Sequence, residues 1–165
     1  MHRRPLRLLG LTLVMSTAMF AARAPARAEG GPFGLGLILG SPTGVSAKLY
    51  LNKRNAIDFA LGFAFLNRRG IAVHADYLWH PVMLATDEAF FLPLYFGVGA
   101  RILDHDRGSD DDDFHLGARV PVGILFDFKT IPLDVFLEVA LVVDIIKDHG
   151  DVIDLNAGIG ARYYF

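Results

Sequence analysis

Ionisable side chains occur at alternate positions within otherwise apolar stretches of this sequence. His74 and Asp76 are separated by one residue, and Lys48 and Asp58 lie five residues before and after Lys53. Alternate residues of an extended chain point to the same side, so a reversal at Lys53 puts Lys48 opposite Asp58. Burying a charge is costly unless it is paired. We therefore predict an ion pair between Lys48 and Asp58.

The same alternation assigns a larger set of ionisable residues to this polar face. They are Lys48, Asp58, His74, Asp76, Arg101, Arg119, Asp134, Glu138, Asp144, Asp154 and Arg162. Because opposite charges in a small buried space pair with one another, we predict a charge network with a structural role. The alternative is a minor channel for ions, protons or small solutes. That path would run along Lys48, Asp58, Arg101, Arg119 and Asp144.

A metal site at His74 and Asp76 needs a third ligand from another strand. His80 does not supply it, since at about 3.3 Å per residue it stands roughly 20 Å from His74. We expect His74 to be an interior histidine with its hydrogen bonds satisfied. No cofactor and no metal are predicted at this position.

An acidic run from Asp104 to Asp113 could gather a divalent cation, through Asp104, Asp106 and Asp110, together with residues 148–151. The run lacks the ordered spacing and the closing glutamate of an EF-hand loop. Long acidic runs are usually solvated, so we predict an acidic surface loop. A loop that binds cations, lipopolysaccharide through bridging ions, or a surface partner is the alternative.

Nucleophilic catalysis is not supported by the serines that follow the first 28 residues. These are Ser41, Ser46 and Ser109, and none of them pairs with a histidine on the apolar face. The charged polar face also argues against a slot for an acyl chain. We predict that the protein is not an enzyme.

The elements that must hold these residues are short segments with alternating hydrophobicity, separated by turn residues. Such a pattern predicts β-strands, and adjacent strands in even number predict an up-and-down antiparallel sheet. The predicted strands cover residues 33–40, 43–51, 55–65, 71–80, 90–103, 114–126, 133–145 and 153–165.

The apolar face of these segments is too bulky to point inward. Hydrophobic residues make up 53% of the chain and 13 are Phe, whereas an eight-stranded barrel holds little more than one filling of side chains. Turned outward into lipid, the same side chains fit, and hydrocarbon requires a closed sheet in which every backbone group is paired. The predicted fold class is therefore all-β, an eight-stranded antiparallel up-and-down transmembrane β-barrel.

The first 28 residues are predicted to be a cleavable signal peptide. They contain a basic start, an apolar stretch from Leu8 to Ala22 and the sequence Ala26-Arg27-Ala28. Residues 29–165 then form one domain. Five of the 16 basic residues precede Glu29 and all 18 acidic residues follow Ala28, so this domain has 11 basic residues and a net charge of −7. Nucleic acid is excluded as a partner, and the absence of cysteine excludes disulfide and thiol chemistry.

A signal peptide, eight alternating segments and an aromatic last strand resemble the small eight-stranded outer-membrane barrels of the OmpA and OmpX type, over residues 29–165. The segment from Gly40 to Lys48 is similar to the opening hairpin of an uncharacterised group within them. The resemblance implies the bacterial outer membrane, a monomer, and contact with lipid, lipopolysaccharide, periplasmic chaperones and the outer-membrane assembly machinery. It also implies outer loops at 41–42, 66–70, 104–113 and 146–151. Tyr163 and Phe165 would then belong to the signal that the assembly machinery reads.

Overall fold

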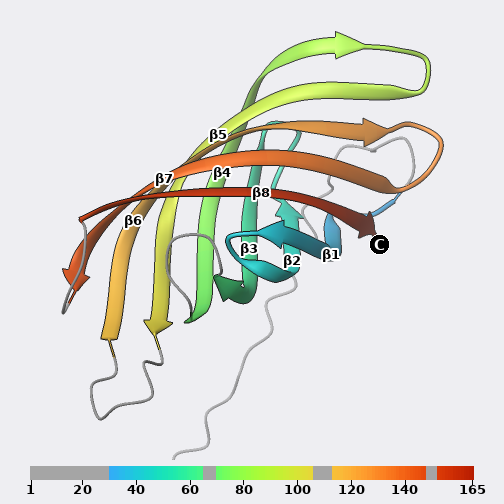
Figure 1. Cartoon of the computed structure of the whole chain (residues 1–165). Helices are drawn as coiled ribbons and strands as arrows, with labels where there is room; N and C mark the ends of the chain where they lie inside the picture. Colours follow the sequence, from blue (N-terminus) through green and yellow to red (C-terminus); the bar gives the residue numbers. More distant parts are fainter. Residues whose placement is uncertain (1–29, 65–69, 106–112, 148–151) are drawn as a thin grey trace, which may run out of the picture.

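The computed structural model describes residues 30–64, 70–105, 113–147 and 152–165, and this part of the chain forms eight β-strands. All eight belong to one closed sheet in which each strand pairs with its neighbours in sequence (Figure 1). The strands are β1 Phe33–Gly40, β2 Thr43–Tyr50, β3 Asn55–Ala64, β4 Gly70–Thr86, β5 Phe90–His105, β6 Asp113–Phe128, β7 Leu133–Lys147 and β8 Ile153–Tyr164. Among the described residues, no helix is long and apolar enough to cross a membrane.

Antiparallel pairing between the first and last strands closes the barrel. The register runs from Gly34 opposite Tyr164 to Gly40 opposite Gly158. Every other neighbouring pair is also antiparallel. The prediction of a closed eight-stranded antiparallel barrel is confirmed. The start of β1 and the end of β8 therefore lie at the barrel end that carries the β2–β3, β4–β5 and β6–β7 turns.

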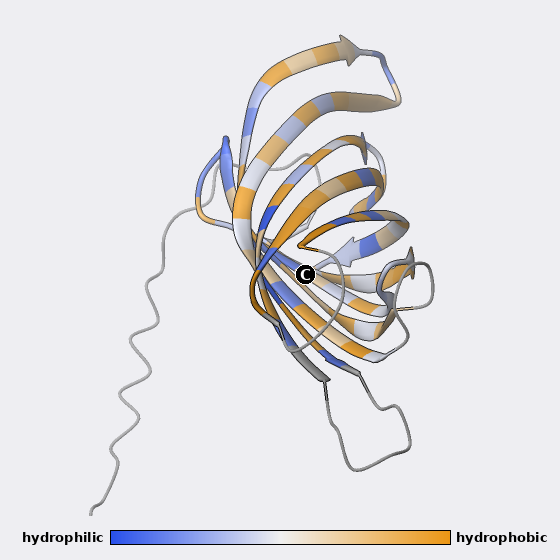
Figure 2. Cartoon of the chain, turned by 60° about the vertical axis from the view of Figure 1, so that its left-hand side comes forward, coloured by the Kyte–Doolittle hydropathy of each residue, from blue (hydrophilic) through white to orange (hydrophobic). Residues whose placement is uncertain are grey.

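Hydrophobic side chains alternate with polar or small ones along the strands (Figure 2). Among the described residues, 33 large hydrophobic side chains are exposed on the outside. Leu37 is 65% exposed and Leu141 46%, whereas Lys48 and Asp58 are only 1% and 2% exposed. The barrel thus has an apolar outer face and a charged, buried interior.

The interior is not uniformly polar, which the alternation of the sequence did not predict. One buried apolar cluster contains Ile38, Ala60, Leu78, Tyr95, Leu125 and Phe136. A second contains Ala64, Ala72 and Leu103. These residues fill the space around the charged groups, so the charges sit in surroundings from which water is largely excluded.

Glycines on the inner face make room for these large side chains. A Cβ atom on Gly160 would collide with the Phe136 ring, and one on Gly123 would collide with Tyr95. Likewise, Gly34 lies under the ring of Tyr164. An eight-stranded barrel can therefore enclose large aromatic and ionic groups because their cross-strand neighbours have no side chain.

The hairpin of β4 and β5 is longer than predicted, because β4 continues through Pro81 to Thr86 instead of ending at His80. Asn55 at the start of β3 pairs with Trp79, and the pairing with β5 is irregular between Trp79 and Val82. Pro81 thus lies past the end of β3, where its missing N–H removes no bond to that strand. In Figure 1 the two strands project as a long hairpin.

Candidate functional site: the charged barrel interior

The interior of the described barrel holds six buried carboxylates, four buried basic side chains and three buried histidines. These are Asp58, Asp76, Asp134, Glu138, Asp144 and Asp154, then Lys48, Arg101, Arg119 and Arg162, then His74, His80 and His115. All eleven residues predicted for the polar face are buried there. With neutral histidines, the described interior carries two more negative than positive charges.

Arg119 on β6 links the neighbouring strand β7 with β4, which lies beyond β5. Its Nη2 donates to Glu138 Oε1 on β7 at 2.6 Å, and its Nη1 donates to Asp76 Oδ2 on β4. The other oxygen of Glu138, Oε2, accepts a hydrogen bond from the Tyr95 hydroxyl at 2.9 Å. One guanidinium thereby compensates two carboxylates, and the tyrosine supports one of them.

Arg162 on β8 makes the corresponding link between β3 and β7. Its Nη1 donates to Asp58 Oδ1, and its Nε lies 3.9 Å from Asp134 Oδ1. The Tyr164 hydroxyl donates to Asp134 Oδ2 at 2.5 Å. The guanidinium also lies 3.8 Å from the centroid of the Phe136 ring, which is a cation–π contact.

Lys48 is the cross-strand partner of Asp58, as predicted. Its Nζ donates to His80 Nε2 at 3.0 Å and lies 5.0 Å from the ring centroids of both Tyr50 and Tyr95. Because His80 Nδ1 faces the carbonyl oxygen of Arg54 at 3.1 Å, Nδ1 carries the proton and Nε2 accepts. A direct Lys48–Asp58 ion pair stays a prediction.

A second cluster surrounds Arg101 on β5, nearer the opposite barrel end. Its Nη1 donates to Asp154 Oδ2 at 2.5 Å, and its Nη2 donates to Asp144 Oδ1 at 3.0 Å. His115 Nδ1 lies 3.5 Å from Asp144 Oδ2. Asn156 Oδ1 accepts a weaker bond from Arg101 Nη1 at 3.3 Å. This cluster connects β5, β6, β7 and β8.

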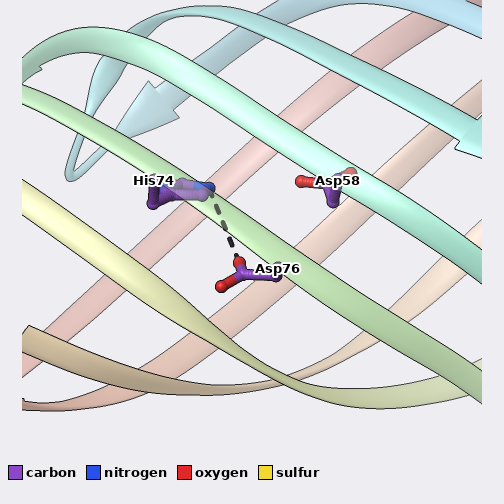
Figure 3. Close-up of side chains that lie close together, drawn as sticks. All are labelled: Asp58, His74 and Asp76. Carbon is purple, nitrogen blue, oxygen red and sulfur yellow. Dashed lines mark ion pairs between the residues drawn. The ribbon is translucent and has the colours of Figure 1, made fainter.

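His74 differs from the other two histidines because neither of its ring nitrogens has a hydrogen-bond partner among the described residues, although the side chain is 1% exposed. The expectation of a satisfied interior histidine is wrong. Its Nε2 lies 3.8 Å from Asp76 Oδ2, and Asp58 points toward the same space from β3 (Figure 3). One ligand atom from each of the three residues lies within 4.8 Å of the others. Asp58 thus lies within reach of His74 and Asp76 from another strand.

Two tyrosines and a histidine of this interior were not identified as site residues from the sequence: Tyr95, Tyr164 and His80. Tyr95 is hydrogen-bonded to Glu138, Tyr164 to Asp134 and His80 to Lys48. Alternation of polar and apolar residues places Tyr95 and Tyr164 on the inner face. This pattern is the feature of the sequence that could have identified them as interior residues. Glu138 and Lys48 lie on strands that do not neighbour those of Tyr95 and His80, and Asp134 is offset from Tyr164 by two residues in register, so strand pairing alone does not reveal these contacts.

Comparison with known proteins now identifies the fold. No protein-family model matches the chain, and no curated protein matches its sequence. Among solved structures, it is similar to the crystal structure of the N-terminal β-barrel domain of Pseudomonas aeruginosa OprF. The TM-score is 0.53 at 13% sequence identity, over 83% of this chain and 100% of that chain. The chain has the fold of a small OmpA-type barrel.

Within this fold, three of the remaining predicted site residues lie at the barrel ends. Tyr163 and Phe165 point outward at the end that carries the termini, with ring centroids 5.2 Å apart. The Phe165 N–H donates to the Phe33 carbonyl oxygen at 2.9 Å. Asp104 is exposed at the opposite end, whereas Asp106 and Asp110, like the predicted signal peptide, lie outside the described residues.

Proposed function

We propose that this chain is an outer-membrane β-barrel protein with a closed, charge-paired interior and a structural or surface-interaction role. The observation that carries the proposal is the belt of exposed hydrophobic side chains around a closed sheet. Monomeric soluble proteins rarely expose apolar patches larger than a few hundred Å², and here such side chains occur on all eight strands or their turns. An outer surface made of hydrophobic side chains is suited to contact with lipid.

Closure of the sheet supports the same location. In hydrocarbon every backbone N–H and C=O must be paired within the protein, which a barrel achieves without an open edge. An eight-stranded barrel with buried ion pairs and aromatic rings in its lumen leaves no wide aqueous path. The proposed role is thus that of a rigid scaffold, with no catalytic residue.

Partners follow from the orientation expected for this class of barrel. The end with the termini would face the periplasm, and the end with the acidic segments would face the cell surface. The outer belt would contact lipid and lipopolysaccharide, and the last strand would be read by the assembly machinery after delivery by chaperones. We propose that the protein acts as a monomer.

Fractionation of cells that express the full chain tests this proposal. We expect the protein in the outer-membrane fraction, with a faster gel band before heating than after it, because a folded barrel stays compact in detergent. A chain that lacks residues 2–28 is the control and should stay in the cytoplasm. Recovery of the full-length protein from the soluble periplasmic fraction would overturn the proposal.

A narrow cation path is the second candidate, favoured by the excess of two negative charges among the described interior residues. Recordings in planar bilayers separate it from the scaffold role. A closed interior predicts no stable open currents, whereas a path lined by these carboxylates predicts currents that favour cations. Steady cation-selective conductance would therefore contradict the scaffold role and support the channel.

A further inference from the structure

We propose that Asp58, His74 and Asp76 form a binding site for one divalent transition-metal ion, of which Zn²⁺ is the best match. The three side chains come from the neighbouring strands β3 and β4, and Asp58 and Asp76 are direct cross-strand partners. Figure 3 shows the imidazole and both carboxylates turned toward a common space. All three side chains are buried. The inference concerns the interior alone and does not depend on which solvent surrounds the barrel.

Unsatisfied polar atoms point to a ligand at this position. Both ring nitrogens of His74 and the Oδ1 atom of Asp76 are buried without a hydrogen-bond partner among the described residues. Leaving such a group unsatisfied is costly, so it calls for a specific explanation. The other buried histidines, His80 and His115, each have a polar partner within 3.5 Å. A metal ion bound here would satisfy one of the two ring nitrogens of His74.

The surrounding side chains resemble the outer shell of a metal site. Arg162 binds one oxygen of Asp58, and Arg119 binds one oxygen of Asp76. Each carboxylate is therefore oriented by an arginine while keeping a second oxygen, and such outer contacts are typical of metal-binding carboxylates. Gly99 stands opposite Asp76, and a Cβ atom there would collide with Asp76 Oδ1. The missing side chain keeps room for the free oxygen.

Electrostatics also favour a bound cation. Two carboxylates directly opposite each other on neighbouring strands repel one another, and the two arginines are shared with Glu138 and Asp134. The six carboxylates of the described interior outnumber its four basic groups. A divalent ion bound by Asp58 and Asp76 would cancel that deficit of two positive charges.

The ligand set selects the class of metal. One imidazole and two carboxylates suit Zn²⁺ and its neighbours, whereas Ca²⁺ takes six to eight oxygen ligands. Three protein ligands and a water would complete a tetrahedral zinc site. In such a site ligand atoms stand about 3.4 Å apart, given Zn–N and Zn–O bonds of about 2.1 Å. The atoms here lie within 4.8 Å of one another. Side-chain rotations that move these atoms by about 1 Å would therefore bring them to the spacing of a zinc site.

Zinc content of the refolded barrel tests the proposal. The chain without a histidine tag is refolded in detergent with Zn²⁺ present, because the closed interior restricts later entry, and is then desalted. We expect about one zinc per chain by mass spectrometry of the metal. His74→Gln should lose this zinc. His80→Gln, which also removes a buried imidazole, should retain it.

Two further measurements make the result decisive. A variant with Asp104, Asp106 and Asp110 changed to Asn should retain the zinc, which separates the interior site from the acidic loop. If His74→Gln does not show the compact gel band of a folded barrel, X-ray absorption of the zinc-loaded natural chain replaces it and should show one nitrogen and two or three oxygen ligands. Absence of zinc, zinc retained by a folded His74→Gln variant, or zinc with oxygen ligands only would overturn the proposal. A soluble location would overturn the proposed function but leave this measurement intact.

Discussion

At the scale of single residues, the interior is held together by arginines that each serve two carboxylates. Arg119 connects Asp76 with Glu138, and Arg162 connects Asp58 with Asp134. A buried ion pair contributes little compared with an apolar replacement of both partners, but removal of one partner leaves an uncompensated buried charge. Replacement of one of these arginines alone should therefore lower the free energy of unfolding, because its carboxylate partners stay buried without it.

Replacement of Arg119 by Met should strongly destabilise the folded barrel. Two buried carboxylates, Asp76 and Glu138, would lose their charged partner, and such losses cost about 3–5 kcal/mol. Urea unfolding in detergent micelles measures the free energy of unfolding. Arg54→Met, at an exposed arginine of the β2–β3 turn, is the control and should change it by less than about 0.5 kcal/mol. An Arg119 variant as stable as this control would show that the pairing is not needed.

Adjacent tyrosines on β8 provide a matched comparison of the two barrel faces. Tyr164 is buried and donates to Asp134 Oδ2 at 2.5 Å, whereas Tyr163 is 49% exposed on the outside. Tyr164→Phe should lower the free energy of unfolding by about 1–3 kcal/mol, because it leaves a buried carboxylate oxygen without this donor. Tyr163→Phe should change it by less than about 0.5 kcal/mol. Equal effects of the two replacements would contradict the assignment of faces.

At the scale of the strands, alternation of apolar and polar residues was enough to predict eight strands and which face of each points inward. The predicted end of β4 was wrong because a proline such as Pro81 usually ends a strand. The sequence does not show that Pro81 lies beyond the residues of β4 that pair with β3. Pairing of neighbouring strands also put Lys48 opposite Asp58. Strand pairing did not reveal contacts such as Arg162 with Asp58, because β3 and β8 meet only across the closed lumen.

The last strand carries a prediction about assembly. Removal of Phe165 should reduce the amount of folded protein in the outer membrane several-fold while export and cleavage near Ala28 continue, since the terminal aromatic belongs to the proposed assembly signal. Immunoblots of fractionated cells measure both quantities. Phe63→Ala removes another exposed outward phenylalanine, on β3, and should leave the yield nearly unchanged. Normal yield without Phe165 would remove this residue from the signal.

At the scale of the whole molecule, the barrel is built with an apolar outside and a charged inside. Single residues of the interior pair across the lumen, glycines give them room, and closure of the sheet pairs the backbone at its seam. The OprF barrel domain shares this fold at 13% identity, which illustrates that alternation and closure define such barrels more than particular residues do. Both features fit the proposal that the outer face of the barrel meets lipid.

Unfolding of Leu141→Arg in phospholipid vesicles tests that claim most directly. Leu141 is outward and 46% exposed near the middle of β7, whereas Ile145 is 72% exposed near its end. Arginine at the centre of a lipid-facing strand costs about 2–4 kcal/mol, and near the interface about 0–1 kcal/mol. We expect this difference in the free energy of unfolding between Leu141→Arg and Ile145→Arg. Equal and small effects of both replacements, as on a surface that faces water, would contradict the account.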